Sequence, residues 1–335
     1  MLSHAPSRAD AGTRVYDSVL EMLPDVDNPT PLVRINALTV PGSTLYAKLE
    51  WMNPFGSVKD RAAWEMLRDL ERRGELGAHL PRRGIVEPTS GNTGFSLAVL
   101  AGVSGYHMRA VVPSKVPIEK RALMRLAGAE VDVVSDALCP LPGSEDGALG
   151  LARSHARAQP DRYVMPNQYE NDANVRAHER TTGPEIWRQS EGRVTHVFVT
   201  LGTCGTAMGI ARYLRSVAGG VKVIAVQPSP GHDVPGLRAG AELGVSKLLD
   251  RDELDEIVEV PFEKAYTNSA ELLRHEGLRA GPSSGLVFEG ARRYALRSPV
   301  AFGVMIFCDD VFKYMSKVIE HLPELSGDAG AESAT

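Results

Sequence analysis

The sequence predicts an α/β protein whose parallel sheets are covered by helices, and two observations support this prediction. Short β-branched segments alternate with amphipathic helical segments along almost all of the 335 residues, and this alternation is typical of parallel sheets covered on both faces. The length suggests two domains of ordinary size. Ligands of such sheets bind beyond the carboxyl ends of the strands, so we expect the chemistry at the strand-to-helix turns.

The predicted elements follow one another in alternating order. Runs of β-branched residues predict strands at residues 44–50, 85–87, 108–112, 130–134, 194–200, 221–226, 256–260 and 304–307. Apolar residues at helical spacing predict helices that include residues 59–73, 93–104, 118–127, 205–217, 263–275 and 286–297. A weak domain boundary is expected around residues 163–174, after a loop rich in Pro and Gly near residues 139–147.

Composition excludes several classes of protein. With 43% hydrophobic and 24% charged residues the chain is neither disordered nor a disulfide scaffold. The formal charge of -5 does not favour nucleic-acid binding. Three scattered cysteines argue against a disulfide framework and a zinc site, so no metal is expected. The N-terminus lacks a secretory signal and no window reaches the roughly 18 apolar residues of a membrane span, so we expect a cytoplasmic protein that does not bind membranes.

The turn after the strand at 194–200 reads LGTCGT and leads into a helix. Gly202, Thr203, Cys204, Gly205 and Thr206 offer successive backbone N–H groups and two hydroxyls at a helix N-terminus, which suits a phosphate dianion. It matches neither a Walker loop nor G-x-G-x-x-G. A tight turn that needs glycine for its backbone angles explains the same residues equally well.

A second turn reads EPTSGNTG, again between a strand and a helix. Thr89, Ser90, Asn92 and Thr93 can present hydroxyls, an amide and N–H groups to a carboxylate. Each of these residue types is also a preferred helix cap, and capping is the favoured interpretation for any one of them. Four together exceed what a single cap needs.

A lysine and a serine turn complete the set. Lys59 is expected at the N-terminus of a helix, where a cation is unfavourable, and partial burial there would make its amine a better nucleophile. The fragment by itself favours an ordinary surface lysine. The turn AGPSSG precedes the helix at 286–297, and its sequence favours Ser283 and Ser284 as caps.

Together these features suit one cofactor. A lysine that can form a Schiff base and a phosphate cradle are what pyridoxal phosphate requires. The motifs NPTPLVR, NPFGSVKDR, EPTSGNTG, NQYENDAN followed by TTGPEIW, LGTCGT and GPSSG occur between residue 28 and about residue 316. In order and spacing the chain resembles the cysteine synthase and cystathionine β-synthase family of fold type II pyridoxal-phosphate enzymes, above all its cysteine synthase B-type branch.

The resemblance implies a role for each matching position. Lys59 would form the Schiff base and take the substrate Cα proton, Asn92 would hydrogen-bond the 3-oxygen of pyridoxal 5'-phosphate, and Ser283 would face the pyridine nitrogen. The loop for the cofactor phosphate would comprise Gly202, Thr203, Cys204, Gly205 and Thr206. The groups for the substrate carboxylate would be Thr89, Ser90, Gly91, Thr93 and Gln168.

The resemblance also implies the architecture. It predicts two open twisted, mostly parallel sheets flanked by helices, as in the tryptophan synthase β chain. Residues 52–163 would form a smaller lobe, residues 1–51 with 164–325 a larger lobe, and residues 326–335 a flexible tail. The family analogy further suggests a homodimer.

The implied reaction is a β-replacement that makes L-cysteine from O-acetylserine or O-phosphoserine and sulfide through an aminoacrylate. Closure of the small lobe would shield the reacting centre from water. Cystathionine β-synthase, which uses serine and homocysteine, remains an alternative, as do a cysteine desulfhydrase and a diaminopropionate-forming synthase. A non-enzymatic binding protein on the same fold is disfavoured because Lys59 and all three loops are retained.

Three segments depart from the family pattern or refine it. Cys204 occupies a position where the phosphate loop of the family commonly has glycine. The favoured interpretation is that Cys204 only fills this small space, and the alternative is a redox role. The segment CDDVFKYMS at 308–316 differs from a family segment written with Gly and Arg before the tyrosine. In GHDVPGLR, Arg238 either pairs with an anionic leaving group such as phosphate or is a solvated loop arginine.

Overall fold

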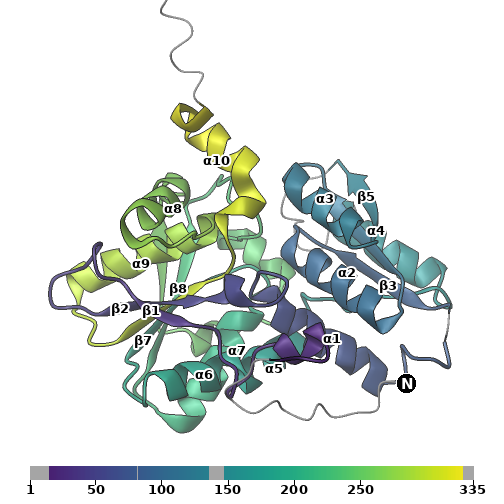
Figure 1. The fold of residues 1–335 in the computed structure, drawn as a ribbon, viewed down its shortest axis with the longest axis horizontal. Coiled ribbons are helices and arrows are strands. Elements are labelled where there is room, and N and C mark those ends of the chain that lie inside the picture. The colour runs from purple at the N-terminus through teal and green to yellow at the C-terminus, as the bar shows by residue number, and fades with distance from the viewer. Residues whose placement is uncertain (1–14, 81, 136–146, 327–335) are drawn as a thin grey trace, which may run out of the picture.

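Two separate sheets organise the chain in the computed structural model, which describes residues 15–80, 82–135 and 147–326 (Figure 1). The larger sheet has the strand order β1-β2-β10-β7-β8-β9 and the smaller has the order β5-β4-β3-β6. Every strand pair is parallel except β1 with β2. The predicted fold class is therefore confirmed. Cys139 and the expected tail beyond Ser326 lie outside the described residues.

All eight predicted strands are present, with ends that shift by a few residues. The strands are β1 Leu32–Arg34, β2 Leu45–Leu49, β3 Gly84–Pro88, β4 Met108–Pro113, β5 Glu130–Val134, β6 Tyr163–Val164, β7 His196–Thr200, β8 Lys222–Pro228, β9 Glu256–Val260 and β10 Gly303–Phe307. The two strands that were not predicted, β1 and β6, have three and two residues. Segments this short show no periodicity that a sequence pattern can detect.

The predicted helices are also present. The helices are α1 Lys59–Arg72, α2 Asn92–Ser104, α3 Ile118–Leu126, α4 Gly147–Ala158, α5 Ala173–Arg180, α6 Thr182–Gln189, α7 Gly205–Val217, α8 Glu263–Glu276, α9 Pro282–Arg297 and α10 Met315–His321. The prediction did not name α4, α5, α6 or α10. One prediction is wrong in detail: α9 begins at Pro282, a full turn earlier than expected, because proline fits the first turn of a helix.

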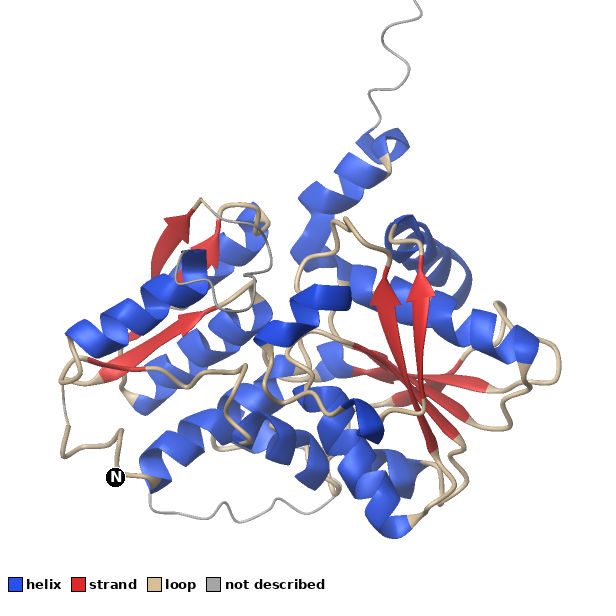
Figure 2. Ribbon diagram, turned by 180° about the vertical axis from the view of Figure 1, so that it is seen from behind, coloured by secondary structure: helices blue, strands red, loops and turns tan. Residues whose placement is uncertain are grey.

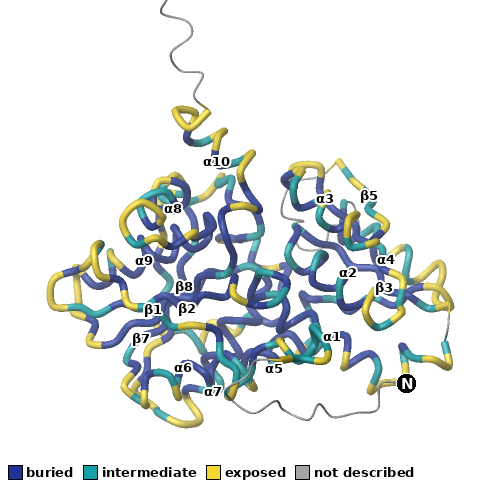
Figure 3. Tube along the Cα trace, viewed as in Figure 1, coloured by how far each residue is buried: buried dark blue, intermediate teal, exposed yellow. Residues whose placement is uncertain are grey.

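Helices lie on both faces of the six-stranded sheet (Figure 2), and the residues of its central strands are buried (Figure 3). Along β7, Phe198 belongs to the core that α9 covers, whereas Val197 and Val199 belong to the core that α7 covers. Successive strand residues point to opposite faces. The continuous apolar strands therefore follow from helices on both sides, as the sequence pattern predicted.

A buried cluster of four charged side chains fixes α1. Arg61 of α1 donates from Nε to Glu50 Oε2 at 2.7 Å and also pairs with Glu185 of α6. Lys48 Nζ lies 2.7 Å from Glu185 Oε2, and Thr30 donates to Glu50 at 2.7 Å. Although burial opposes it, the charges of Arg61 and Lys48 lower the pKa of Glu50 to about 2. Two cations and two anions thus compensate one another in the interior.

No helix in the ranges 15–80, 82–135 and 147–326 is both long and apolar enough to cross a membrane.

The charge cluster predicts a large loss of stability on removal of one charge. Replacing Glu185 by Gln leaves Arg61 and Lys48 with a single carboxylate in the interior, and breaking a buried pair costs about 3–5 kcal/mol. Urea unfolding should show this loss. The matched control is Asp27→Asn in the exposed pair with Arg188, which should cost at most about 1 kcal/mol. If both variants lost the same free energy of unfolding, the buried cluster would contribute no more to stability than an exposed ion pair.

Candidate active site

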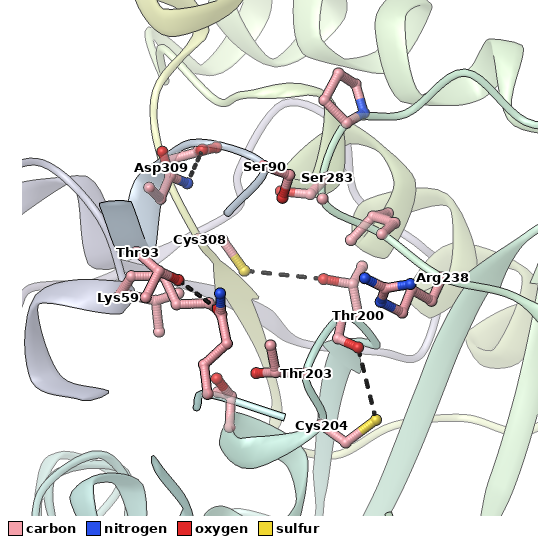
Figure 4. A pocket seen from close by; sticks show the side chains of 18 of the residues that line it. Lys59, Ser90, Thr93, Thr200, Thr203, Cys204, Arg238, Ser283, Cys308 and Asp309 are labelled. Atoms are coloured by element: carbon pink, nitrogen blue, oxygen red, sulfur yellow. Dashed lines mark hydrogen bonds between the residues drawn. The ribbon is translucent and has the colours of Figure 1, made fainter. Parts of the chain in front are cut away.

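A pocket of about 780 Å³, its open mouth included, lies where the carboxyl ends of strands from both sheets meet (Figure 4). Asn92 follows β3, Thr200 ends β7 and Cys308 follows β10. This is the position that parallel sheets predict for a ligand site.

Most of the predicted site residues line this pocket. They are Lys59, Ser90, Asn92, Thr93, Gln168, Gly202, Thr203, Cys204, Thr206, Arg238 and Ser283. Thr89, Gly91 and Gly205 are not among the lining residues. Three loops and one lysine, separated along the chain, are therefore brought together by the fold.

Lys59 is the first residue of α1, and its partly buried side chain lines the pocket. Its backbone N–H donates to Ser57 Oγ at 3.3 Å. Arg61, two residues further on, is held in the buried charge cluster. The first turn of α1 is thereby anchored, and the amine of Lys59 belongs to the pocket wall rather than to an open surface.

The turn after β3 is shaped by Thr89. Its buried Oγ1 accepts from the N–H groups of Gly91 and Gly94, both at 3.0 Å, so that Thr89 satisfies an amide in the first turn of α2. The capping position itself is Gly91, with φ 136°. Capping is therefore a wrong interpretation for Asn92 and Thr93, which lie inside the helix. Thr93 donates to Gln168 Oε1 at 2.6 Å.

The turn after β7 places Cys204 at the N-cap of α7 with φ 68°. A non-glycine residue in this left-handed region costs about 1–2 kcal/mol, which explains why glycine suits the position. An added Cβ at Gly202 would lie 2.7 Å from the carbonyl oxygen of Gly236. At Gly205 it would lie 2.2 Å from Asn174 Oδ1. Both glycines are therefore required by close packing, and Gly202, Thr203, Cys204 and Thr206 line the pocket.

His178, which the sequence analysis did not name, contacts the loop after β7 through Thr206. Its Nε2 lies 3.1 Å from Thr206 Oγ1 and its Nδ1 lies 2.9 Å from Thr182 Oγ1. Burial, with the charges of Arg61 and Lys59, lowers the pKa of His178 to about 3. A neutral imidazole has one donor and one acceptor, so it orients the hydroxyl of Thr206 without adding charge.

Gln168 is held by the buried carboxylate of Glu87. Glu87 accepts from the backbone N–H groups of Asn167 and Gln168 at 2.8 and 3.0 Å. The side chain of Gln168 donates to the carbonyl of Pro88 at 2.7 Å. Burial raises the pKa of Glu87 to about 7 despite these bonds. The amide of Gln168 is thus fixed beside Thr93, where the resemblance expects the substrate carboxylate.

Ser283 and Ser284 lie within the first turn of α9 and do not cap it. The N-cap is Gly281, and no side chain caps the helix. The capping interpretation of both serines is therefore wrong, because Pro282 moves the start of the helix ahead of them. Ser283 lines the pocket, as Figure 4 shows, whereas the hydroxyl of Ser284 is buried.

Arg238 is a buried pocket residue and not a solvated loop arginine. Just 4% of it is exposed. Its Nη2 donates to the hydroxyl of Tyr169 at 2.8 Å, and its guanidinium lies 4.9 Å from the centre of that ring. Its backbone N–H donates to the carbonyl of Leu201 at 2.9 Å. A cation is thereby built into the wall beside the loop after β7.

A second group of lining residues was missed by the sequence analysis. Lys120 donates from Nζ to the hydroxyl of Tyr314 at 2.6 Å, and Tyr314 donates to Asp309 Oδ2 at 2.5 Å. Asn92 donates from Nδ2 to the same oxygen at 2.6 Å. The sequence offered one signal for two of these residues. Asp309 and Tyr314 both lie in the segment CDDVFKYMS, which differs from the family pattern.

The cysteines of the pocket give a testable expectation. Burial raises the pKa of Cys204 and of Cys308 to about 11, so at pH 8 about one thiol in a thousand is ionised, against about one in four for a free cysteine. We expect iodoacetamide to label both about 250-fold more slowly than after unfolding in urea, in proportion to the ionised fraction, as followed by peptide mass spectrometry. Rapid labelling of folded protein at Cys204 would favour the redox role.

Comparisons with known proteins agree with this geometry. The pattern of the pyridoxal-phosphate dependent enzyme family matches residues 23–309. Cysteine synthase B of Salmonella typhimurium is 38% identical over 304 residues, covering 89% of this chain and 96% of its own. Cysteine synthase B of Escherichia coli is 37% identical over 303 residues, with the same coverages.

Two solved structures have a fold similar to that of this chain over most of its length. The structure of an O-ureido-L-serine synthase has a TM-score of 0.83 and 30% identity, covering 95% of this chain and 100% of that one. A hydrogen sulfide-producing enzyme from Fusobacterium nucleatum has a TM-score of 0.81 and 29% identity, covering 90% and 100%. The family match and the extent of these similarities show that this chain belongs to the family of pyridoxal-phosphate-dependent enzymes that includes cysteine synthase B.

Proposed function

We propose that the protein is a cysteine synthase that replaces the β-substituent of O-acetylserine or O-phosphoserine by sulfide. One observation carries the proposal: Lys59, Ser90 with Thr93, and four of the five residues of the loop Gly202–Thr206 line a single pocket. These are an amine, a set of carboxylate ligands and a phosphate cradle. The reaction requires all three within the reach of one cofactor.

The pocket residues fit pyridoxal phosphate. The loop Gly202–Thr206 joins a helix N-terminus to the hydroxyls of Thr203 and Thr206, which suits the phosphate. Asn92 Oδ1 is buried and lacks a hydrogen-bond partner among the described residues, so a polar ligand atom can satisfy it. When bound, the cofactor supplies an electron sink for the negative charge that develops at the substrate Cα. Ser283 would then face its ring nitrogen.

The chain itself would bind and orient the substrate and move one proton. Ser90, Thr93 and Gln168 would hold the carboxylate, and the hydrogen bond between Thr93 and Gln168 already fixes two of these groups. The amine of Lys59 would then take the Cα proton as a general base. Its position at the anchored start of α1 keeps it on one side of the substrate.

We extend the proposal to the organisation of the protein. The strands of the smaller sheet all lie within residues 84–164, which supports a smaller lobe at 52–163 and a larger lobe formed by 1–51 and 164–325. We propose that the two lobes close on the substrate, and that the enzyme acts as a homodimer in the cytoplasm. The cysteine synthase relatives support an amino-acid substrate and sulfide as its small-molecule partners.

The choice of acceptor and leaving group can be tested with the purified holoenzyme. We expect L-cysteine from sulfide with O-acetylserine or O-phosphoserine, and no such product from serine. Lys59→Ala should lower turnover at least a thousandfold while circular dichroism stays unchanged, because the proton-transferring amine is lost. Product from serine and homocysteine alone would instead identify a cystathionine β-synthase, and full turnover by the Lys59 variant would contradict the mechanism.

Arg238 provides a test of the leaving group. A hydrogen bond to a charged group contributes about 1.5–3 kcal/mol, so Arg238→Gln should raise KM for O-phosphoserine about tenfold to a hundredfold. KM for O-acetylserine should change less than about threefold. Arg251→Gln at an exposed position is the control for loss of positive charge. If both KM values rose equally in the Arg238 variant, this residue would not recognise the phosphate.

A further inference from the structure

The pocket contains a buried carboxylate to which the proposed reaction assigns no role. Asp309 is fully buried after β10, where an isolated bridge pairs it with Ser57. Its Oδ2 accepts from the amide of Asn92 and from the hydroxyl of Tyr314. Buried polar groups in folded proteins are normally paired, so a buried carboxyl group that accepts from two side chains is an organised part of the pocket.

The chemistry of Asp309 gives the hydrogen bonds a fixed direction. A carboxylate accepts hydrogen bonds and cannot donate them, so Asn92 must turn Nδ2 toward it and must leave Oδ1 on the other side. For the same reason Tyr314 must donate to Asp309. The tyrosine oxygen is then free to accept from Lys120, and the three side chains form one chain of donors that ends at Asp309.

The same residue joins the two sheets. Asn92 and Lys120 belong to helices α2 and α3, which pack against the smaller sheet. Asp309 and Tyr314 follow β10 of the larger sheet. Glu119 of α3 also accepts from the backbone and the hydroxyl of Ser316, at 2.7 and 2.9 Å. The orientation of Asn92 is therefore set from the opposite side of the pocket.

We propose that Asp309 is a positioning residue of this active site, which orients the amide of Asn92 for the cofactor and, through Tyr314, holds the ammonium of Lys120 in the pocket wall. Only one part of this proposal rests on the proposed function, namely that Asn92 binds the cofactor. The proposal does not require Asp309 to contact the substrate. Its effect is to decide whether Asn92 presents a donor or an acceptor to the ligand.

Lys120 provides an independent readout. Burial lowers its pKa to about 8, against the effect of Asp309. The other charged groups that act on it are Lys313 and Lys59, which lower the pKa further, and Asp310, which raises it. Removing the charge of Asp309 removes the largest influence that favours the ammonium. Any property of the site that depends on the charge of Lys120 should then titrate at a lower pH.

The experiment compares Asp309→Asn with the wild type and with the control Asp310→Asn. Each apoenzyme is titrated with pyridoxal phosphate, and the visible spectrum of the holoenzyme is recorded between pH 6 and pH 10. We expect Asp309→Asn to weaken cofactor binding about tenfold, because the new amide lets Asn92 turn over. We also expect it to move to lower pH the spectral change that follows the charge of Lys120. The control should bind the cofactor within about twofold of wild type.

A double-mutant cycle distinguishes positioning from a general structural effect. If Asp309 acts through Asn92, Asp309→Asn should add little to the loss of cofactor affinity already caused by Asn92→Ala. Wild-type affinity and an unchanged spectrum in Asp309→Asn, or additive losses in the double variant, would overturn the proposal.

A second variant covers the case in which Asp309→Asn does not fold. Tyr314→Phe keeps the carboxylate, its bond to Asn92 and the direct pair of Lys120 Nζ with Asp309 Oδ2 at 3.9 Å, but removes the hydroxyl that accepts from Lys120. The spectral change that follows the charge of Lys120 should therefore move to lower pH while the affinity stays within about threefold. No movement would overturn the proposal. Because these readouts are cofactor binding and its spectrum, they remain valid if the wild type makes no cysteine, an outcome that would contradict the proposed function alone.

Discussion

The compensated charge cluster around Arg61 is the constraint on which the rest of the structure depends. It unites Lys48 of β2 and Glu50, which directly follows that strand, with Arg61 of α1 and Glu185 of α6. Buried charges tolerate little displacement, since each must keep its partner in a medium of low polarity. Lys59 stands two residues before Arg61 on the same helix. The amine that we propose as the general base is therefore positioned by a cluster whose four side chains are not among the residues that line the pocket.

Two kinds of element then complete the pocket. Turns after β3 and β7 supply hydroxyls and N–H groups because the carboxyl ends of parallel strands meet helix N-termini there. Their conformation depends on close contacts at Gly202 and Gly205 and on Thr89, whose hydroxyl serves the backbone. Glu87 and His178 are not among the residues that line the pocket. They fix two residues that do line it, since Glu87 accepts from the backbone of Gln168 and His178 contacts the hydroxyl of Thr206.

Most of the helices and strands, which depend on residues close together in the sequence, could be predicted. The site residues whose roles depend on contacts between distant segments could not. Eight of the ten described strands and the six named helices could be found because their apolar residues repeat at regular spacing, whereas β1 and β6 are too short to show such a pattern. Ser283 was misread as a cap because Pro282 allows the helix to begin earlier. The roles of Lys120 and Asp309 could not be predicted, since Asp309 meets Asn92 across 217 residues and Lys120 meets Tyr314 across 194 residues.

The charges of the pocket wall point to the kind of molecule it accepts. Lys59, Lys120 and Arg238 are its cations, and Asp309 is its one anion among the described lining residues. Asn92 and Tyr314 both donate to its Oδ2, whereas its Oδ1 has no hydrogen-bond partner among the described residues. The surplus of positive charge matches a phosphate on one side and an amino-acid carboxylate on the other. A pocket with this balance would also attract an anionic nucleophile such as hydrosulfide more strongly than a neutral thiol, which connects the electrostatics of the wall to the choice of acceptor.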